Sequence, residues 1–279
     1  MKTVLLCGGK GTRLGEVTGS ALPKPMVRIG GRPILWHIMK QYSAAGFNDF
    51  VVCAGHLSWS IKEYFLNYHA QHADVTVSTA ARAPVRFHGG EGTEDWTVTI
   101  AETGEDTMTA GRVKRVAGYV DGDDFMLTYG DGVSNVDLAA LLAFHRAHGK
   151  LMTMTGVIPA GRFGELVIED DRVAEMQEKP MASDRYINGG FMVLKRAFID
   201  RFLPGDVDGV MLEREPFAEA ARAGEMMLFK HDGFWQCMDT LRDVRALNAL
   251  WDSGAPPWLD AERQAQAVSG SLGRLAGLP

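Results

Sequence analysis

The sequence predicts an α/β fold in which helices cover a parallel sheet. Short apolar runs typical of buried strands, at 4–7, 49–54 and 74–79, alternate with stretches of helical spacing. A glycine-rich loop directly follows the first run, and ligands of such sheets bind outside the carboxyl ends of the strands. The strand pattern therefore predicts the fold class, and the position of the loop predicts where a ligand binds.

The size and composition of the chain exclude several classes of protein. With 279 residues, 46% of them hydrophobic, the chain can form one large α/β domain or two small ones. Its net charge of −6 argues against a nucleic-acid partner, and no apolar run approaches the length of a membrane span. The start of the chain lacks the pattern of a signal peptide. Cys7, Cys53 and Cys237 fit neither a zinc site nor a disulfide framework, which favours a reducing compartment. From these observations together we expect a cytoplasmic protein with no membrane partner.

The glycine-rich loop is the strongest candidate for a ligand site. Gly8, Gly9 and Gly11 fall within four positions, and consecutive backbone N–H groups in such a turn can form an anion-binding concavity. Arg13 adds a planar fork suited to phosphate. Lys24, held between two prolines, adds a second cation on a stiff segment. Together these residues predict a cradle for a polyphosphate.

Spacing excludes two better-known phosphate loops. The fifth residue after Gly8 is Arg13 and the fifth after Gly9 is Leu14, so the P-loop pattern GxxxxGK[ST] is absent. The dinucleotide fingerprint GxGxxG also fails, because Leu14 stands where its third glycine would be. The simpler alternative is that the glycines form only a tight turn after a strand. Arg13 and the Pro-Lys-Pro sequence at 23–25 argue against this alternative.

The remaining elements follow from hydrophobic spacing and turn signals. Pro33 suits the first turn of a helix at 34–42, and Ser58 is a plausible cap for the next helix. The stretch 80–110, with a β-like run at 96–101, is expected to be an inserted loop or hairpin. Further helices are expected at 109–119, 137–148, 196–202, 213–223 and 241–251, and strands or apolar stretches at 125–131, 151–158, 165–169, 172–177, 191–194 and 234–238.

Two of these apolar stretches end in an acidic residue. Asp131 stands between Gly130 and Gly132 at the carboxyl end of a predicted strand, on the side of the glycine loop. Asp239 closes the last apolar stretch. A turn aspartate is the simpler alternative for Asp131, but a position at a strand end favours a metal ligand.

Seven short motifs occur in order along the chain. They are GGKGTRL at 8–14, PKPM at 23–26, YGDG at 129–132, FG at 163–164, EKP at 178–180, INGG at 187–190 and MDT at 238–240. Together they resemble the sugar-nucleotide pyrophosphorylases, up to about Trp258. The resemblance implies a Rossmann-like mixed, mostly parallel sheet in one domain at 1–258, with the insertion at 80–110 and a tail at 259–279. Cys7 departs from the family pattern, which usually has Ala there.

A closer resemblance concerns the substrates. The stretches 33–40, 61–65, 111–115, 161–164 and 233–243 are most similar to family members that use CTP. The resemblance implies transfer of a cytidylyl group from CTP to a sugar 1-phosphate, expected to be α-D-glucose 1-phosphate, with release of pyrophosphate and with Mg²⁺ as cofactor. The phosphate monoester is mostly a dianion at neutral pH, because its second pKa is about 6, and so it needs no general base. Catalysis would then depend on positioning and charge neutralisation.

The resemblance also implies a role for each candidate residue. The catalytic residues would be Arg13, Lys24, Asp131 and Lys179. The nucleotide would be bound by Leu6, Gly8, Gly9, Gly11, Thr12, Arg13, Lys24, Gly111, Arg112, Gly130 and Asp131. The sugar phosphate would be bound by Gly164, Glu178, Lys179, Asn188 and Gly189. The metal would be bound by Asp131 and Asp239.

Simpler roles remain open for several of these residues. Glu178 and Lys179 could be a solvated pair, and Asn188 could be a turn residue before a strand. Arg112 could belong to an exposed basic helix face, and Trp235 is more often a core residue than a sugar platform.

Other functions also remain open. The same scaffold could use UTP, dTTP or another sugar 1-phosphate. A non-catalytic nucleotide-sensing subunit would be expected to lack a cradle cation or a metal aspartate, and a glycosyltransferase would be expected to carry Asp-x-Asp in place of Gly-Asp-Gly.

Two finer expectations concern base selectivity and assembly. Arg112 can only donate hydrogen bonds, which suits O2 and N3 of cytosine and opposes the N3–H of uracil. The stretch 80–110 is unusually long for a loop, and we expect it to pack against a neighbouring subunit. The resemblance implies a homo-oligomer, with a hexamer as one arrangement to test.

Overall fold

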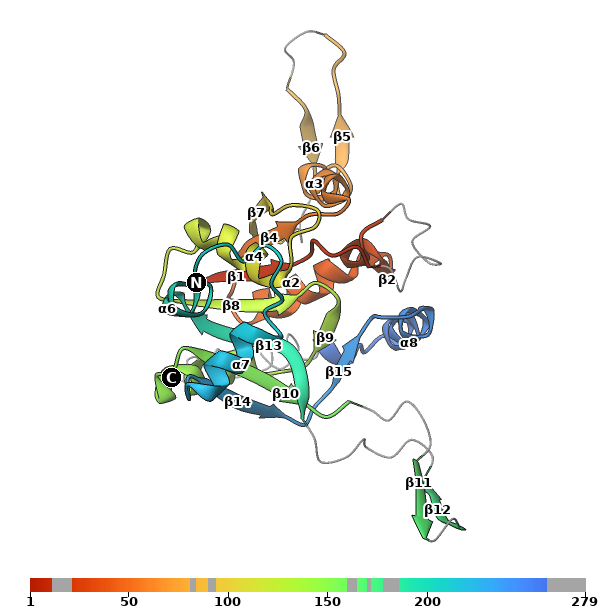
Figure 1. Ribbon diagram of the computed structural model, residues 1–279. Helices are drawn as coiled ribbons and strands as arrows, with labels where there is room; N and C mark the ends of the chain where they lie inside the picture. Colours follow the sequence, from red (N-terminus) through yellow and green to blue (C-terminus); the bar gives the residue numbers. More distant parts are fainter. Residues whose placement is uncertain are drawn as a thin grey trace, which may run out of the picture.

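Among the residues described by the computed structural model, seven strands form a central sheet (Figure 1). These residues are 1–11, 22–80, 84–89, 94–159, 165–169, 172–177 and 186–259. The strands are β1 (Lys2–Leu6), β4 (Asp49–Ala54), β7 (Thr97–Glu102), β8 (Asp124–Tyr129), β10 (Met152–Val157), β13 (Ile187–Lys195) and β14 (Met226–His231). Their order is β14-β10-β13-β8-β1-β4-β7. Strand β13 is antiparallel to β10 and β8 and the other neighbouring pairs are parallel, which confirms the mixed, mostly parallel sheet.

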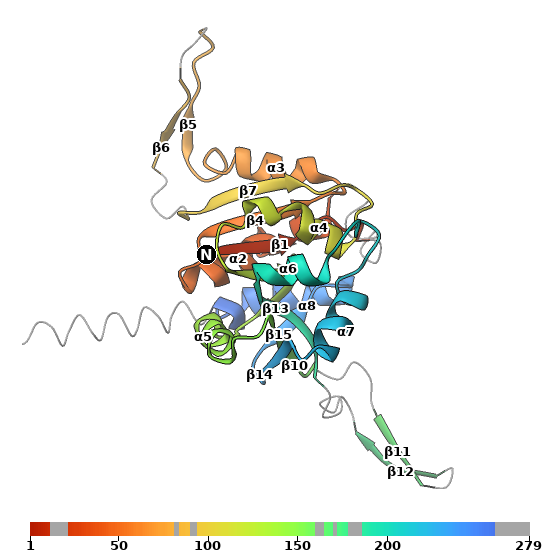
Figure 2. The same cartoon turned by 60° about the vertical axis from the view of Figure 1, so that its left-hand side comes forward.

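Helices cover both faces of the sheet (Figure 2). They are α2 (Ile34–Ala44), α3 (Ser58–Leu66), α4 (Thr109–Arg115), α5 (Leu138–His148), α6 (Arg196–Phe202), α7 (Glu215–Arg222) and α8 (Leu241–Asp252), with short 3-10 turns η2 (Lys24–Met26), η3 (Ala117–Tyr119) and η4 (Pro257–Leu259). Successive side chains of β1 enter different cores, because Leu5 packs with α2, α5 and α8 whereas Val4 and Leu6 pack with α4 and α6. Such burial on both faces explains the nearly continuous apolar runs. Of the described helices, none combines the length and apolar composition that crossing a membrane requires.

A short strand pair outside the central sheet joins two distant parts of the chain. Strand β9 (Gly132–Ser134) follows β8 and pairs antiparallel with β15 (Trp235–Cys237). The Met238 N–H then donates to the Asp131 carbonyl at 2.8 Å. The pairing therefore brings the end of β8 next to the end of β15. Two further pairs are β2 (Arg28–Ile29) with β3 (Arg32–Pro33), and β11 (Glu165–Glu169) with β12 (Arg172–Gln177), which is the hairpin expected from the sequence.

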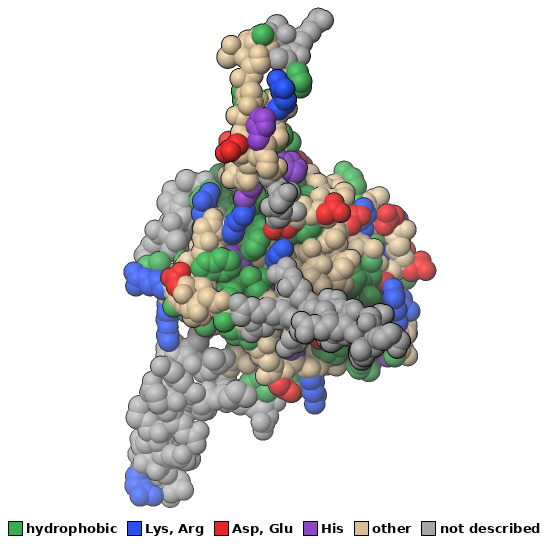
Figure 3. All heavy atoms as spheres, turned by 180° about the vertical axis from the view of Figure 1, so that it is seen from behind, with side chains coloured by type: hydrophobic (Ala, Val, Ile, Leu, Met, Phe, Trp, Pro, Cys, Tyr) green, Lys and Arg blue, Asp and Glu red, His purple; other side chains and the backbone are tan. Residues whose placement is uncertain are grey.

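The stretch between α3 and α4 differs from the sequence prediction. The prediction of a third parallel strand at 74–79 is wrong, because β5 (Asp74–Thr76) pairs antiparallel with β6 (Arg86–His88) in a hairpin that stands out from the body (Figures 1 and 3). The third parallel strand is β7, which lies inside the expected insertion at 80–110. The physical reason is burial: Val75 and Val77 are exposed, whereas Val98 and Ile100 of β7 pack against a core.

The start of α3 also differs from the prediction. Ser58 is the first helical residue rather than the cap, and Leu57 precedes it in a left-handed conformation with φ of 54°. The Ser58 hydroxyl donates to Glu102 Oε1 at 2.7 Å instead of to the helix. Helix α3 is thereby attached to β7 at the edge of the sheet.

Candidate active site

The glycine loop leaves β1 at the carboxyl end of the sheet and is held by its neighbours. The His56 N–H donates to the Gly8 carbonyl at 3.1 Å. A Cβ at Gly8 would lie 1.9 Å from Arg112 Nη1, so no larger residue fits without rearrangement. Gly11 has φ of 57°, a conformation that glycine adopts without the steric cost other residues bear. The loop conformation thus depends on glycine at these two positions.

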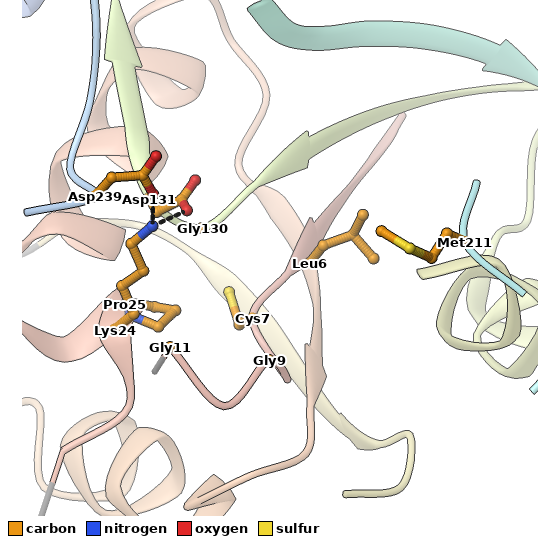
Figure 4. A pocket seen from close by; sticks show the side chains of 10 residues that line it. All are labelled: Leu6, Cys7, Gly9, Gly11, Lys24, Pro25, Gly130, Asp131, Met211 and Asp239. Atoms are coloured by element: carbon orange, nitrogen blue, oxygen red, sulfur yellow. Dashed lines mark hydrogen bonds and ion pairs between the residues drawn. The ribbon is translucent and has the colours of Figure 1, made fainter. Parts of the chain in front are cut away.

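The loop forms one wall of a pocket of about 500 Å³ (Figure 4). The pocket is lined by Leu6, Cys7, Gly9, Gly11, Lys24, Pro25, Gly130, Asp131, Met211 and Asp239. Most of the described residues predicted to bind the nucleotide or the metal are in this set. Met211 was not predicted; it points toward Leu6 at one side of the pocket (Figure 4). We call this space the loop pocket.

Two carboxylates and one ammonium group meet in the loop pocket. Lys24 Nζ lies 2.6 Å from Asp131 Oδ2 and 2.5 Å from Asp239 Oδ1 (Figure 4). Burial alone would lower the pKa of Lys24, but its interactions with the two carboxylates outweigh this effect and raise the pKa above its ordinary value. Lys24 is therefore charged throughout the neutral pH range, and it neutralises part of the repulsion between the carboxylates.

The sequence around each of these residues fixes its backbone. Lys24 begins η2 directly after Pro23, and the Met26 N–H closes that turn on the Pro23 carbonyl at 2.8 Å. Asp239 precedes the capping box of α8, in which Thr240 and Asp243 cap each other's backbone N–H groups. Asp243 Oδ2 also accepts from the Asp239 N–H at 3.0 Å. Rigid local motifs thus place both residues before any ligand binds.

The carboxylate pair fits a magnesium site that substrate completes. Within the described ranges, no cluster of three or more His, Cys, Asp or Glu side chains could hold a metal ion. Mg²⁺ is commonly bound by one or two carboxylates together with water and substrate phosphates, so two carboxylates suffice for this ion. Asp131 and Asp239 already lie around a common cation, the Lys24 ammonium group.

A second pocket, of about 230 Å³, shares both carboxylates with the first. It is lined by Thr128, Tyr129, Asp131, Gly132, Asn188, Gly189, Trp235, Cys237 and Asp239. Asn188 Nδ2 donates to the Tyr129 hydroxyl at 3.0 Å, and Trp235 Nε1 donates to the Gly189 carbonyl at 2.8 Å. The structure thus brings together Asn188 and Gly189, the described residues predicted to bind the sugar phosphate. We call this space the acceptor pocket.

Tyr129 and Trp235 are site residues that the sequence reasoning missed. Tyr129 directly precedes Gly130-Asp131, so its place in the YGDG motif was a usable signal. Trp235 lies on β15, and only its pairing with β9 brings it to the pocket. Nothing in the local sequence predicts that pairing.

Arg112 and Gly111 do not line either pocket. Arg112 is 4% exposed, which rules out the exposed basic face for this residue. Its Nη1 donates to Thr103 Oγ1 at 2.7 Å and its Nη2 donates to the Gly8 carbonyl at 2.9 Å. A Cβ at Gly111 would lie 2.8 Å from the Asp208 Cα, so Gly111 serves close packing. These hydrogen bonds let Arg112 support the glycine loop, and its donation to the base stays a prediction.

Five of the predicted site residues lie outside the described ones. They are Thr12, Arg13, Gly164, Glu178 and Lys179. Their roles stay predictions, as does the tail, of which residues 260–279 are outside the described part.

Comparisons with known proteins agree with the fold. A profile of the family described as nucleotidyl transferase matches residues 2–252. The glucose-1-phosphate cytidylyltransferase of Salmonella typhi is 50% identical over 259 residues, which cover 92% of this chain and 98% of the relative. A probable glucose-1-phosphate cytidylyltransferase of Bacillus subtilis is 42% identical over 258 residues, covering 92% and 99% of the two chains.

Solved structures share the fold at lower sequence identity. HddC from Yersinia pseudotuberculosis superposes with a TM-score of 0.65, covering 90% of this chain and 99% of that one, at 21% identity. This likeness supports the architecture of the sheet and its helices.

Proposed function

The chain belongs to the nucleotidyl transferase family, and we propose that it transfers a cytidylyl group from CTP to α-D-glucose 1-phosphate. The products are CDP-glucose and pyrophosphate. The names and high identity of the Salmonella and Bacillus relatives support this choice of substrates. The observation that carries the proposal is the position of Asp131 and Asp239, which line both the loop pocket and the acceptor pocket.

The proposed chemistry matches the groups in the two pockets. The sugar phosphate attacks as a dianion, since its second pKa is about 6, so no general base is needed. The main barrier is repulsion between this phosphate and the triphosphate, which positively charged groups relieve. Lys24 reaches the phosphates once its ammonium group leaves the two carboxylates. When bound by Asp131 and Asp239, Mg²⁺ would supply further charge neutralisation and align the phosphates.

The residues outside the described ranges complete the proposal. Arg13 and Thr12 extend the glycine loop and would contact the triphosphate. Lys179 would bind the sugar phosphate, while Glu178 and Gly164 would lie against the sugar ring. All five assignments come from the motifs in which these residues stand.

A homo-oligomer in the cytoplasm is part of the same proposal. The β5–β6 hairpin carries exposed apolar side chains, among them Val77 (65% exposed) and Phe87 (47% exposed), on an element that stands clear of the body (Figure 3). A neighbouring subunit would cover them. Light scattering at micromolar concentration should report an oligomer, and a monomer would contradict this part of the proposal.

A substrate panel tests the proposed reaction. Each of CTP, UTP, dTTP and GTP is incubated with glucose 1-phosphate, Mg²⁺ and the protein, and pyrophosphate release is measured. We expect the highest kcat/KM with CTP. Equal values for CTP and UTP would overturn the assignment of the base, and absence of pyrophosphate with every nucleotide would favour a nucleotide-sensing role.

A further inference from the structure

Glu213 connects helix α4 with Tyr129 of the acceptor pocket, although it lines neither pocket itself. It lies in the segment between α6 and α7, whose backbone runs beside the start of α4: the Met108 N–H donates to the Asp208 carbonyl at 2.7 Å and the Ala110 N–H donates to the Val210 carbonyl at 3.1 Å. Met211 of the same segment reaches the loop pocket (Figure 4). The segment is therefore in contact with α4 and with the loop pocket.

The two carboxylate oxygens of Glu213 accept hydrogen bonds from different elements. Oε1 accepts from the Tyr129 hydroxyl on β8 at 2.7 Å. Oε2 accepts from the Thr109 hydroxyl on α4 at 2.8 Å. The Thr109 hydroxyl itself accepts from the Leu212 N–H at 2.8 Å, so its single proton must point to Glu213. Each carboxylate oxygen of Glu213 thus accepts a hydrogen bond from a hydroxyl group.

Because Glu213 only accepts, the directions of the hydrogen bonds between Tyr129, Asn188 and Gly190 are fixed. Because Tyr129 gives its proton to Glu213, it can offer only lone pairs to Asn188, which must present its Nδ2 at 3.0 Å. Asn188 Oδ1 then faces the Gly190 N–H and accepts from it at 2.9 Å.

The orientation of the Asn188 amide decides what the acceptor pocket offers to a sugar. One N–H of Nδ2 goes to Tyr129, and among the described residues the second has no partner. Asn188 lines the acceptor pocket, so this N–H is a donor available to a ligand oxygen there.

We propose that Glu213 is a positioning residue that orients the Asn188 amide, through Tyr129, as a hydrogen-bond donor to a hydroxyl group of the sugar phosphate. The inference rests on the proposed function, because it takes the ligand of the acceptor pocket to be a sugar phosphate. Glu213 acts through two other residues and does not itself touch the substrate.

The nearly isosteric change Glu213→Gln reverses the direction of this chain of hydrogen bonds. Thr109 still needs an acceptor, so the glutamine oxygen faces Thr109 and the glutamine NH₂ faces Tyr129. Tyr129 must then turn its proton toward Asn188, where it meets the Nδ2 donor. Turning the amide to bring Oδ1 to Tyr129 would leave Nδ2 facing the Gly190 N–H, so one of the two contacts is lost in either orientation. One buried polar group is left unpaired, which lowers the melting temperature, and the Asn188 amide no longer presents its second N–H to the ligand, which costs roughly tenfold in binding.

Steady-state kinetics with a stability measurement test the proposal. For Glu213→Gln we expect KM for glucose 1-phosphate to rise about tenfold while KM for CTP stays unchanged. Glu215→Gln, two residues further on and paired with Arg222 on the surface, is the matched control and should change neither KM. Equal rises in both KM values, or no rise for glucose 1-phosphate, would overturn the role of Glu213.

A compensating variant separates this inference from the proposed function. In Glu213→Gln/Asn188→Asp, both oxygens of the new carboxylate can accept, from Tyr129 and from the Gly190 N–H, so the melting temperature lost in Glu213→Gln should return. KM for glucose 1-phosphate should stay high, because the amide donor is gone. Failure of the melting temperature to return would contradict the hydrogen-bond directions, whether or not the protein uses CTP. Inactivity of the unmodified protein with CTP and glucose 1-phosphate would instead refute the proposed function.

Discussion

The loop pocket and the acceptor pocket share two carboxylates but are built in different ways. The loop pocket is lined largely by glycines and backbone from the end of β1, with Lys24 as its cation. The acceptor pocket is lined by polar side chains from β8, β13 and β15, which hydrogen-bond to their neighbours. Backbone N–H groups and a cation suit a polyphosphate, whereas oriented side chains suit sugar hydroxyls. Asp131 and Asp239 lie where the two pockets meet, which is where the proposed transfer would take place.

Removing a shared carboxylate should have the largest effect. We expect Asp131→Asn to lower kcat by roughly a hundredfold or more, because charge stabilisation of the transition state is lost for both substrates. The melting temperature should fall only modestly, because Lys24 loses one ion pair but keeps the one with Asp239, and an amide has nearly the same shape as a carboxylate. Asp252→Asn, on the exposed end of α8, is the matched control. Near-normal turnover of Asp131→Asn in Mg²⁺ would contradict the claim that this carboxylate serves both pockets.

Arg112→Ala should weaken the loop pocket and leave the acceptor pocket unchanged. Arg112 donates to the Gly8 carbonyl and to the Gly104 carbonyl at 2.8 Å, so its loss loosens the glycine loop for every nucleotide. We expect KM for CTP and KM for UTP to rise by the same factor, about tenfold, with KM for glucose 1-phosphate unaffected. A selective loss of CTP preference, with CTP binding intact, would instead support the role in base recognition that the sequence predicts.

The same contrast explains which parts could be predicted from the sequence. The glycine loop, Lys24 and Asp131 belong to local motifs, and the buried parallel strands are continuous apolar runs, so spacing was sufficient. Strand β14 was missed because it lies at the sheet edge with exposed residues such as Leu228, and its hydrophobic pattern is weak. Trp235 lines the acceptor pocket and Glu213 is connected to it through Tyr129, in both cases through contacts with residues far away in the chain.

Arg112 shows a second limit of sequence reasoning. An arginine after a glycine at the start of a helix can face a ligand or the protein, and both choices give the same local sequence. The decision depends on the acceptors around it, and here these are oxygens of Gly8, Thr103 and Gly104. Gly8 lies in the loop after β1, whereas Thr103 and Gly104 lie in the loop after β7. The position of one loop relative to the other depends on the fold and cannot be read from the local sequence.

Lys24 offers a smaller test, of metal binding rather than turnover. Its ammonium group lies between the two carboxylates that would bind a metal, so Lys24 and a divalent cation compete for them. We expect Mn²⁺ to bind Lys24→Met several times more tightly than the unmodified protein in the absence of nucleotide, as measured by electron paramagnetic resonance. Weaker Mn²⁺ binding by Lys24→Met would show that the ammonium group does not occupy the cation position.

The smallest effect concerns pH. The folded protein raises the pKa of Lys24 above its ordinary value, so the stability from its ion pairs is complete below the unfolded pKa of about 10.4 and is lost only as pH rises through the higher folded value. Turnover and melting temperature should therefore show no change from Lys24 between neutral pH and about pH 9. A turnover midpoint within this range that disappears in Lys24→Arg would contradict the assignment.

The central claim is that one metal position serves both pockets, and phosphorus relaxation tests it directly. The protein is saturated with Mn²⁺, a non-hydrolysable CTP analogue and glucose 1-phosphate, and the ³¹P relaxation of glucose 1-phosphate is recorded. The account predicts strong relaxation enhancement of the glucose 1-phosphate signal in the unmodified protein and its loss in Asp131→Asn and Asp239→Asn. Enhancement confined to the phosphates of the nucleotide in the unmodified protein would contradict a shared reaction centre.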